Sequence, residues 1–324
     1  MAHAIRIHET GGAEVLRWEE VSVPEPGPGE VKIAQSAVGV NYIDTYHRAG
    51  LYPMELPGSI GMEGAGTVTA IGDGVTDLAV GDRVCYASLP VGSYATERVM
   101  PANRLAKTPD TVSDQEAAAM MLQGMTVEYL IKRTYPVQAG ETVLFHAAAG
   151  GVGLLACQWL KHLGVTVIGT VGSEAKAELA KAHGCTHTIL YRQEDVAAQV
   201  RALTDGAGVP VVYDSVGRDT WMASLDSLQP RGLLVTFGNA SGPVDAVNLG
   251  ILGQKGSLYV TRPTLMTYTA SVTDLRASAA ALFEVVTAGA VKIPVNQTYP
   301  LADAAQAHRD LEARKTTGST VLIP

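Results

Sequence analysis

The sequence predicts an α/β protein in which a doubly wound parallel sheet is joined to a second, β-rich domain. Three observations lead to this prediction. A glycine-rich turn separates an apolar run from an amphipathic segment at 143–163, and apolar runs alternate with helical segments over residues 123–264. Residues 1–122 instead contain short β-like runs that Gly and Pro interrupt. Alternating strands and helices are typical of parallel sheets, whereas short strands with frequent turns are typical of barrels and sandwiches.

The composition is typical of a globular protein. The chain has 324 residues, of which 47% are hydrophobic and 17% charged, so two domains can each bury a core. A formal net charge of -8 argues against nucleic-acid and anionic-membrane partners, because such partners need clustered Lys and Arg. No apolar run approaches the ~20 residues of a membrane span, and the N-terminus lacks the apolar region of a signal peptide. Cys85, Cys157 and Cys185 form no Cys-x-x-Cys pair, which is typical of a reducing compartment and predicts a cytoplasmic protein.

The first domain contains turn-forming segments at 24–29, which reads Pro-Glu-Pro-Gly-Pro-Gly, and at 72–74, which reads Gly-Asp-Gly. The apolar and β-branched runs between such turns predict an all-β barrel or sandwich-like domain. Around 114–122 the pattern becomes helical, and we place the domain boundary there. The predicted strands are 31–34, 66–71, 83–86 and 94–99.

The most informative segment is 143–153, which reads Val-Leu-Phe-His-Ala-Ala-Ala-Gly-Gly-Val-Gly. Apolar residues then recur at helical spacing up to the glycine that precedes the next apolar run. A strand, a tight turn and a helix N-terminus form the pyrophosphate site of dinucleotide-binding units. Ala148 replaces the first glycine of the usual pattern, so the strand and helix around the turn strengthen the prediction of a bound dinucleotide at Gly150, Gly151 and Val152. A purely structural glycine turn is the alternative.

Six apolar runs alternate with helical segments in this second domain and predict a doubly wound parallel sheet of the Rossmann type. Beyond the sheet we expect a helix at 277–287 and a terminal strand at 319–323, which we expect to rejoin the first domain. The six runs are 143–145, 165–171, 188–191, 210–216, 232–238 and 257–261.

The end of the second parallel strand indicates which dinucleotide binds. A position about 20 residues beyond the glycine turn carries a carboxylate in NAD enzymes, where it holds the ribose hydroxyl. Here Gly172 is followed by Ser173, which can donate to a 2′-phosphate, and Lys176 adds a positive charge one helical turn later. Tyr191, at the end of the next strand, can contact the same phosphate or the adenine. We therefore expect NADPH, with Glu174 turned to solvent at the start of a helix, where its charge is favourable; the alternative for Lys176 is an ordinary solvated helix lysine.

Two further strand ends should border the cofactor, because ligands of open parallel sheets bind beyond the carboxyl ends of the strands. Phe237, Gly238 and Asn239 end the fifth run, and the segment 214–217, which contains Ser215, ends the fourth. The alternative is that strand ends need turn residues in any case.

Five segments, at 38–46, 50–53, 147–153, 212–217 and 255–263, together form a pattern that runs nearly end to end. The pattern resembles the NADPH:quinone oxidoreductase family, the zeta-crystallin-like branch of the zinc-free medium-chain dehydrogenases/reductases. The resemblance implies a GroES-like catalytic domain made of residues 1–122 and completed by about 265–324, and a Rossmann NADPH-binding domain at 123–264. It also implies NADPH in the cleft between these domains, and a homodimer formed by the Rossmann domains. The apolar end of 255–263 can supply the edge strand that a symmetry mate covers.

The resemblance also implies cofactor contacts at the residues that match the family pattern. They divide into a nicotinamide side, a central part, an adenosine-phosphate end and a remainder. In that order they are Asn41, Asp44 and Thr45; Tyr129, Gly151 and Val152; Ser173, Lys176 and Tyr191; and Phe237, Gly238, Asn239, Pro263 and Arg314.

Zinc-dependent relatives bind a catalytic metal through a cysteine and through the histidine of a Gly-His-Glu motif. This sequence has Asn41 and Met62 at the corresponding positions, and it has no four-cysteine loop, so we expect no metal. A simple ketone that accepts a hydride becomes an alkoxide with a conjugate-acid pKa near ~16, the value for bulk water. A quinone becomes a phenolate with a conjugate-acid pKa near ~10, so the protein supplies roughly 8 kcal/mol less charge stabilisation. Conjugated acceptors are therefore the expected substrates.

Hydrogen-bond donors can meet this smaller demand, and Asn41, Tyr46 and Tyr52 are the candidates near the expected cleft. We expect Tyr52 to bind the quinone oxygen; a packing aromatic in a loop is the alternative. The leading hypothesis is hydride transfer from NADPH to a quinone without a metal. An enone or alkenal reductase shares the conjugated acceptor, and an NADPH-binding structural, sensory or RNA-binding protein is a third possibility, although the acidic composition weighs against RNA.

Overall fold

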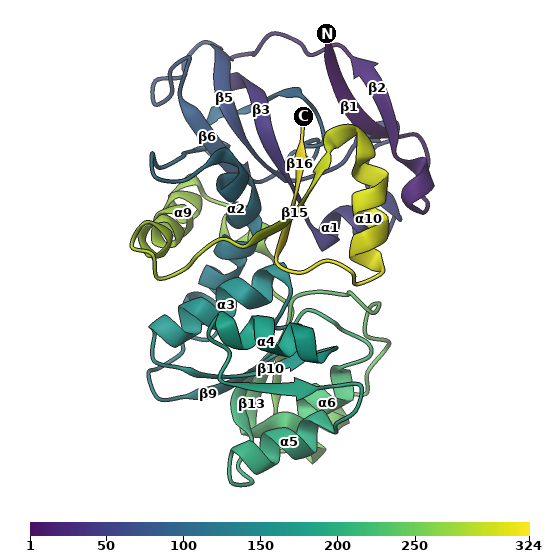
Figure 1. Ribbon diagram of the computed structural model, residues 1–324, viewed down its shortest axis with the longest axis vertical. Coiled ribbons are helices and arrows are strands. Elements are labelled where there is room, and N and C mark those ends of the chain that lie inside the picture. Colours follow the sequence, from purple (N-terminus) through teal and green to yellow (C-terminus); the bar gives the residue numbers. More distant parts are fainter. The chain divides into compact units, whose positions relative to one another are not determined.

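The computed structural model describes residues 1–324 and divides the chain into two compact units. Unit 1 contains Met1–Met125, Thr269–Thr287 and Ile293–Pro324, and unit 2 contains Thr126–Tyr268 and Ala288–Lys292. Both chain ends therefore belong to unit 1 (Figure 1). The sequence predicted domain limits at 122 and 264, a few residues before the ends of the first and second long segments.

Unit 1 is built around a seven-stranded sheet in which β15, β16, β3, β5, β6 and β8 are neighbours in that order, and β7 also pairs with β3. A smaller sheet has the order β2-β1-β4. The predicted strands 31–34, 66–71 and 83–86 lie in β3, β5 and β6, and 94–99 overlaps β7. The strands are β1 (Ala2–Ile7), β2 (Arg17–Val21), β3 (Glu30–Val40), β4 (Gly58–Ser59), β5 (Glu63–Ile71), β6 (Arg83–Ala87), β7 (Glu97–Pro101), β8 (Ala106–Lys107), β15 (Val295–Pro300) and β16 (Ser319–Ile323).

The last strand, β16, pairs antiparallel with β3 and parallel with β15. The prediction that the C-terminal strand rejoins the first domain is therefore confirmed. Its apolar residues continue the buried core of unit 1, where Leu322 packs in a cluster with Ile5 and Val38. The helices that begin in this unit are α1 (Tyr42–Arg48), α2 (Asp114–Tyr129), α9 (Val272–Thr287) and α10 (Ala304–Glu312).

Unit 2 is a six-stranded sheet with the strand order β11-β10-β9-β12-β13-β14, and every neighbouring pair is parallel. Helices α3 and α4 contact one another, as do α5 and α6, and Figure 1 shows the two pairs on opposite sides of the sheet. This doubly wound parallel sheet confirms the predicted fold class. The strands are β9 (Thr142–Phe145), β10 (Thr166–Val171), β11 (His187–Leu190), β12 (Val209–Asp214), β13 (Leu228–Thr236) and β14 (Tyr259–Thr261), and the helices are α3 (Gly151–His162), α4 (Glu174–Ala182), α5 (Val196–Leu203), α6 (Trp221–Ser227), α7 (Gly250–Gln254) and α8 (Leu265–Tyr268).

Each of the six predicted apolar runs overlaps a strand, and the central strands β9, β10 and β12 are buried along nearly their whole length because helices cover both faces of the sheet. Leu144, Ile168, Ile189, Val212 and Leu234 belong to one core cluster that joins five neighbouring strands. None of the helices in the chain has both the length and the apolar character that crossing a membrane requires.

Candidate functional site

The glycine-rich turn connects β9 to α3, and Gly150 is the residue before the helix. A Cβ atom at Gly153 would lie 2.7 Å from the Cα of Ala148 and would also overlap the carbonyl oxygen of Ala147. Only glycine fits there, so the first turn of α3 packs directly against the turn. Gly150, Gly151 and Val152 are partly exposed. The first-turn N–H groups of a helix have no intrahelical acceptor and favour an anion, so this end of α3 can hold a phosphate group.

A buried hydrogen-bond network holds the glycine-rich turn. The Asp214 carboxylate accepts hydrogen bonds from the Ser224 hydroxyl (2.8 Å) and from the backbone N–H of Val216 (2.7 Å). Since the Ser224 proton is used in this way, Ser224 accepts from His146 Nε2 (3.0 Å), and His146 Nδ1 accepts from the Thr170 hydroxyl (3.0 Å). Burial lowers the pKa of His146 and keeps the ring neutral. A neutral ring is needed here because Nδ1 accepts a hydrogen bond while Nε2 donates one.

The network ends on the turn itself, because the backbone N–H of Ala147 donates to Thr170 Oγ1 (3.3 Å). Ala147 has a φ of 55°, a left-handed conformation that an alanine adopts only when its surroundings hold it. No role is expected from the sequence for His146, Thr170 or Ser224. The only signal was a polar histidine at the end of an apolar strand.

The predicted adenosine-phosphate residues come together at the carboxyl ends of β10 and β11. Ser173 caps α4 by accepting a hydrogen bond from the backbone N–H of Lys176 (3.4 Å), and its hydroxyl proton can still donate to a ligand. A Cβ atom at Gly172 would lie 3.0 Å from the Tyr191 hydroxyl, which shows how closely that ring approaches the strand end. Arg192 lies 5.9 Å from the centre of the Tyr191 ring and adds a cation that the sequence analysis missed. Ser173 and Tyr191 are exposed, so this group faces solvent.

The other two strand ends also approach one another. A Cβ atom at Gly238 would lie 2.9 Å from the Cα of Ser215, and the Phe237 N–H donates to the carbonyl of Asp214 (2.8 Å). In the amide orientation that satisfies its neighbours, Asn239 accepts a hydrogen bond from Arg262 (3.1 Å). These contacts bring the carboxyl ends of β12, β13 and β14 together.

Arg262 connects this group to Tyr129. Burial raises the pKa of the Tyr129 hydroxyl, and the positive charge of Arg262 opposes that shift. The Tyr129 ring stacks on Tyr268 at 4.5 Å between centroids and 14° between planes. Pro263, the residue after Arg262, is buried. Arg262 is exposed and was missed, although it lies inside the family-like segment 255–263.

In unit 1, Asn41 stands immediately before helix α1 and is 5% exposed. Its side-chain nitrogen donates to Glu63 Oε2 (2.6 Å), and its side-chain oxygen accepts from Gln123 Nε2 (3.4 Å). The backbone N–H of Asn41 donates to Asp44 Oδ2 (2.8 Å), which completes a capping box at the start of the helix. The amide of Asn41 is therefore held in one orientation.

Asp44 and Thr45 have side chains that are turned into the protein. The Asp44 carboxylate accepts a hydrogen bond from the Tyr94 hydroxyl (3.0 Å), and burial raises its pKa to about 7. Thr45 Oγ1 donates to the carbonyl of Tyr42 (2.7 Å). The cofactor contacts expected of Asp44 and Thr45 stay predictions. In this structure Asp44 accepts a hydrogen bond from the backbone N–H of Asn41.

The two candidate substrate tyrosines lie together beside α1. The rings of Tyr46 and Tyr52 meet edge to face at 5.4 Å, and the His47 ring lies 5.8 Å from Tyr52. The Tyr52 N–H donates to the Tyr46 carbonyl (3.2 Å), so the loop is tied to the helix. Tyr46 is buried and Tyr52 is partly exposed, which leaves Tyr52 the more accessible of the two.

Arg314 follows α10 with a φ of 59° and is exposed. Burial and then the charge of Glu312 raise the pKa of Tyr42, and the Arg314 charge opposes this shift, so Arg314 lies near the start of α1. Within each unit, the structure thus brings predicted site residues close to one another.

The buried Glu63 side chain should make the stability of the protein depend on pH. Burial raises its pKa from 4.5 to about 8, although hydrogen bonds from Asn41 and Leu122 favour the ionised form. The folded protein holds this proton more tightly than the unfolded chain, so the stabilisation is complete below about pH 4.5 and is lost as the pH rises through 8. Relative to Glu63→Gln, which mimics the protonated acid, the wild-type free energy of unfolding should fall by on the order of 3 to 5 kcal/mol over this range. Urea denaturation at several pH values measures this difference, and parallel pH profiles would contradict it.

Two parts of the chain match models of known protein families. Residues 27–110 match the model of the alcohol dehydrogenase GroES-like domain, and residues 151–278 match the model of the zinc-binding dehydrogenases. The first match confirms the GroES-like part of the predicted fold. Nowhere in the chain do three His, Cys, Asp or Glu side chains group as metal ligands.

Individual relatives match over the whole chain. The quinone oxidoreductase of Pseudomonas aeruginosa is 55% identical, with 100% of both chains covered. The 2-haloacrylate reductase of a Burkholderia species is 46% identical over 100% of this chain and 99% of its own. The crystal structure of Escherichia coli quinone oxidoreductase complexed with NADPH has a TM-score of 0.98 and 49% identity, covering 99% of this chain and 100% of that one.

Proposed function

Because the chain belongs to the quinone oxidoreductase family of medium-chain dehydrogenases/reductases, we propose that it transfers a hydride from NADPH to a quinone. The observation that carries this proposal is the placement of Ser173, at the start of α4 after β10, close to Tyr191, which follows β11, with Lys176 in the first turn of α4. A hydroxyl and a cation at this strand end suit a dinucleotide that carries a 2′-phosphate.

The residues of unit 2 fit NADPH in two places. The start of α3, at Gly151 and Val152, suits the pyrophosphate, and Gly153 lets the first turn of α3 pack directly against the glycine-rich turn. Ser173 and Lys176 offer a hydroxyl and a cation to the 2′-phosphate. The remaining contacts proposed in this unit are Tyr129, Gly150, Gly172, Tyr191, Ser215, Phe237, Gly238, Asn239 and Pro263.

In unit 1 we assign Asn41, Asp44, Thr45 and Arg314 to the cofactor as well. NADPH, when bound, supplies the hydride. The protein must then stabilise the negative oxygen that develops on the quinone, and donors held in advance do this without reorganising. Asn41 uses one of its two amide hydrogens on Glu63, and the second is available as such a donor.

Tyr52 is the residue that we expect to donate to the quinone oxygen, with the Tyr46 ring holding it edge-on. The phenolate product can take its proton from water, so Tyr52 orients the substrate and no dedicated acid is required. Tyr52→Phe should raise KM for quinones about 5- to 20-fold, the loss of one hydrogen bond of about 1–2 kcal/mol, and leave KM for NADPH unchanged. Tyr259→Phe, a 62%-exposed tyrosine on β14, is the control. Full quinone turnover with an unchanged KM would remove the hydrogen-bonding role from Tyr52.

The direct test of the function is NADPH oxidation by the purified chain with a panel of quinones, enones and aldehydes. We expect the highest kcat/KM with quinones. The similarity to a 2-haloacrylate reductase supports an enone-type acceptor as the second candidate function, because both acceptors are conjugated. A chain that binds NADPH but oxidises it with no acceptor in the panel would contradict both enzymatic functions.

We also propose that the protein is a cytoplasmic homodimer formed through unit 2. Strand β14 ends the sheet with β13 as its neighbour, and the exposed apolar side chains Met222, Leu249 and Tyr259 belong to the same unit. An open sheet edge readily pairs with a second copy. The three cysteines are buried and free, which supports a reducing compartment. Light scattering should give the mass of a dimer, and a monomer at micromolar concentration would refute this assembly.

A further inference from the structure

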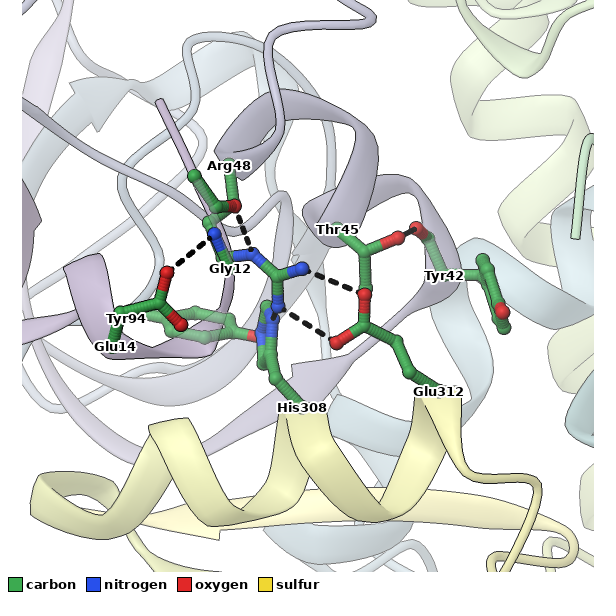
Figure 2. Close-up of polar contacts among 9 residues, drawn as sticks. Gly12, Glu14, Tyr42, Thr45, Arg48, Tyr94, His308 and Glu312 are labelled. Carbon is green, nitrogen blue, oxygen red and sulfur yellow. Dashed lines mark hydrogen bonds and ion pairs between the residues drawn. The ribbon is translucent and has the colours of Figure 1, made fainter. Parts of the chain in front are cut away.

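A network of polar side chains joins α1 to α10, two helices that are far apart in the sequence (Figure 2). Arg48, on the last turn of α1, binds both carboxylate oxygens of Glu312, at 2.7 Å and 3.0 Å. The same guanidinium donates to the carbonyl of Gly11 (3.1 Å) and lies 3.0 Å from His308 Nδ1. Arg48 is 3% exposed and His308 is fully buried, whereas the Glu312 side chain is 39% exposed.

The direction of each hydrogen bond in this network is determined by its chemistry. Arginine has only donors, so His308 Nδ1 accepts from Arg48 and the His308 proton is on Nε2. Burial and the Arg48 charge lower the pKa of His308 to about 3, so the ring is neutral. Nε2 then donates to the Tyr94 oxygen (2.9 Å), and the single Tyr94 proton donates to Asp44 Oδ2 (3.0 Å). Asp44 Oδ2 also accepts the backbone N–H of Asn41 (2.8 Å).

One end of this directed network is a residue assigned to the cofactor, and the other end lies two residues before such a residue. One end is Asn41, the residue before α1, whose backbone is held by Asp44. The other end is Glu312, the last residue of α10, which is followed in the same chain segment by Arg314. Thr45 lies on α1 between Asn41 and Arg48. One network therefore reaches both parts of unit 1 to which cofactor contacts are assigned.

Stability alone is a poor explanation for these residues. Removing charges from water costs several kcal/mol per ion, and apolar residues of similar volume often stabilise a protein as well or better. A purely structural tie between α1 and α10 would not need a chain of hydrogen bonds that ends on the backbone of Asn41.

We propose that Arg48, His308 and Glu312 are positioning residues that hold the start of α1 and the Arg314 segment in the arrangement that binds NADPH. They do not touch the cofactor and act through Asp44, Asn41 and Arg314. The proposal rests on the proposed function, because it takes these three contacts as part of the cofactor site.

Two conservative variants test the proposal in the full chain. Glu312→Gln keeps the size of a half-exposed side chain but removes its charge, and Arg48→Lys keeps the charge but loses the two-pronged contact. The control is Asp77→Asn, which removes an exposed ion pair with Arg276 elsewhere in unit 1. Fluorescence titration with NADPH should show a dissociation constant about 5- to 30-fold higher for Glu312→Gln and Arg48→Lys, and unchanged for Asp77→Asn.

A second measurement does not depend on the cofactor. Hydrogen exchange of the NADPH-free protein should be faster in both variants at residues 41–49 and 312–318 and unchanged in the β9–β14 sheet, because only the ends of the network are released. If the variants melt at a lower temperature but bind NADPH as the wild type does, the network is only structural and the proposal is wrong. If Arg48→Lys does not fold, Glu312→Gln alone decides.

The two proposals fail in different ways. A wild-type chain that binds NADPH but reduces no quinone contradicts the proposed function, and the ratio of variant to wild-type dissociation constants still decides the positioning role. A wild-type chain that does not bind NADPH contradicts both.

Discussion

Replacement of Gly153 with alanine should raise the dissociation constant for NADPH about 100-fold. The new Cβ atom would overlap the Ala147 carbonyl oxygen and lie 2.7 Å from the Cα of Ala148, so the turn or the start of α3 must move. Overpacking of this kind costs about 1–3 kcal/mol, and about 3 kcal/mol corresponds to roughly a 100-fold change in binding. Fluorescence titration with NADPH, on protein shown to be folded by circular dichroism, measures the effect.

Gly253 offers a matched control for this substitution. It is also a helical glycine in unit 2, on α7, and apart from its chain neighbours and its own helix backbone no atom lies within 4 Å of the position its Cβ would occupy. Gly253→Ala should therefore bind NADPH as the wild type does. Binding by Gly153→Ala within threefold of the wild type would show that the turn does not need a glycine for the cofactor.

Replacement of Lys176 with alanine should raise KM for NADPH about 10- to 100-fold and change KM for NADH less than about threefold. A hydrogen bond to a charged group contributes about 1.5–3 kcal/mol, and only NADPH carries the 2′-phosphate that this lysine is proposed to bind. Lys181→Ala is the control on the same helix, since Lys181 pairs with Glu178 at 3.1 Å. Steady-state kinetics with both cofactors provide the comparison, and equal effects on NADPH and NADH would remove Lys176 from the phosphate site.

The fold of unit 2 was predictable because its signals are local. The central strands β9, β10 and β12 are buried and mostly apolar along their length, so their runs can be recognised without knowing their neighbours. The strand β2 was missed for the opposite reason. β2 has the sequence Arg-Trp-Glu-Glu-Val and is mostly exposed, so its strand conformation comes from pairing with β1. Such pairing is not visible in either segment alone.

Some residues of the candidate site could also be proposed from the sequence, and others could not. Ser173, Lys176 and Tyr191 could be proposed as cofactor contacts because they follow strands whose carboxyl ends lie at one edge of the sheet, and that role stays a prediction. Arg262 and Arg192 were missed because a single arginine at a strand end has no distinctive pattern. The structure identifies them by what they contact, which is Asn239 for Arg262 and the Tyr191 ring for Arg192.

The sequence alone was sufficient for the parallel sheet and for the glycine turn, because these depend on residues a few positions apart. Only the three-dimensional structure connects Asn41 to Glu63, His146 to Ser224, and Arg48 to His308 and Glu312. These partners are separated by tens to hundreds of residues, and a buried polar group needs some partner without specifying which one. The choice of partner depends on which segments folding brings together, and the orientation of the site residues therefore follows from tertiary packing.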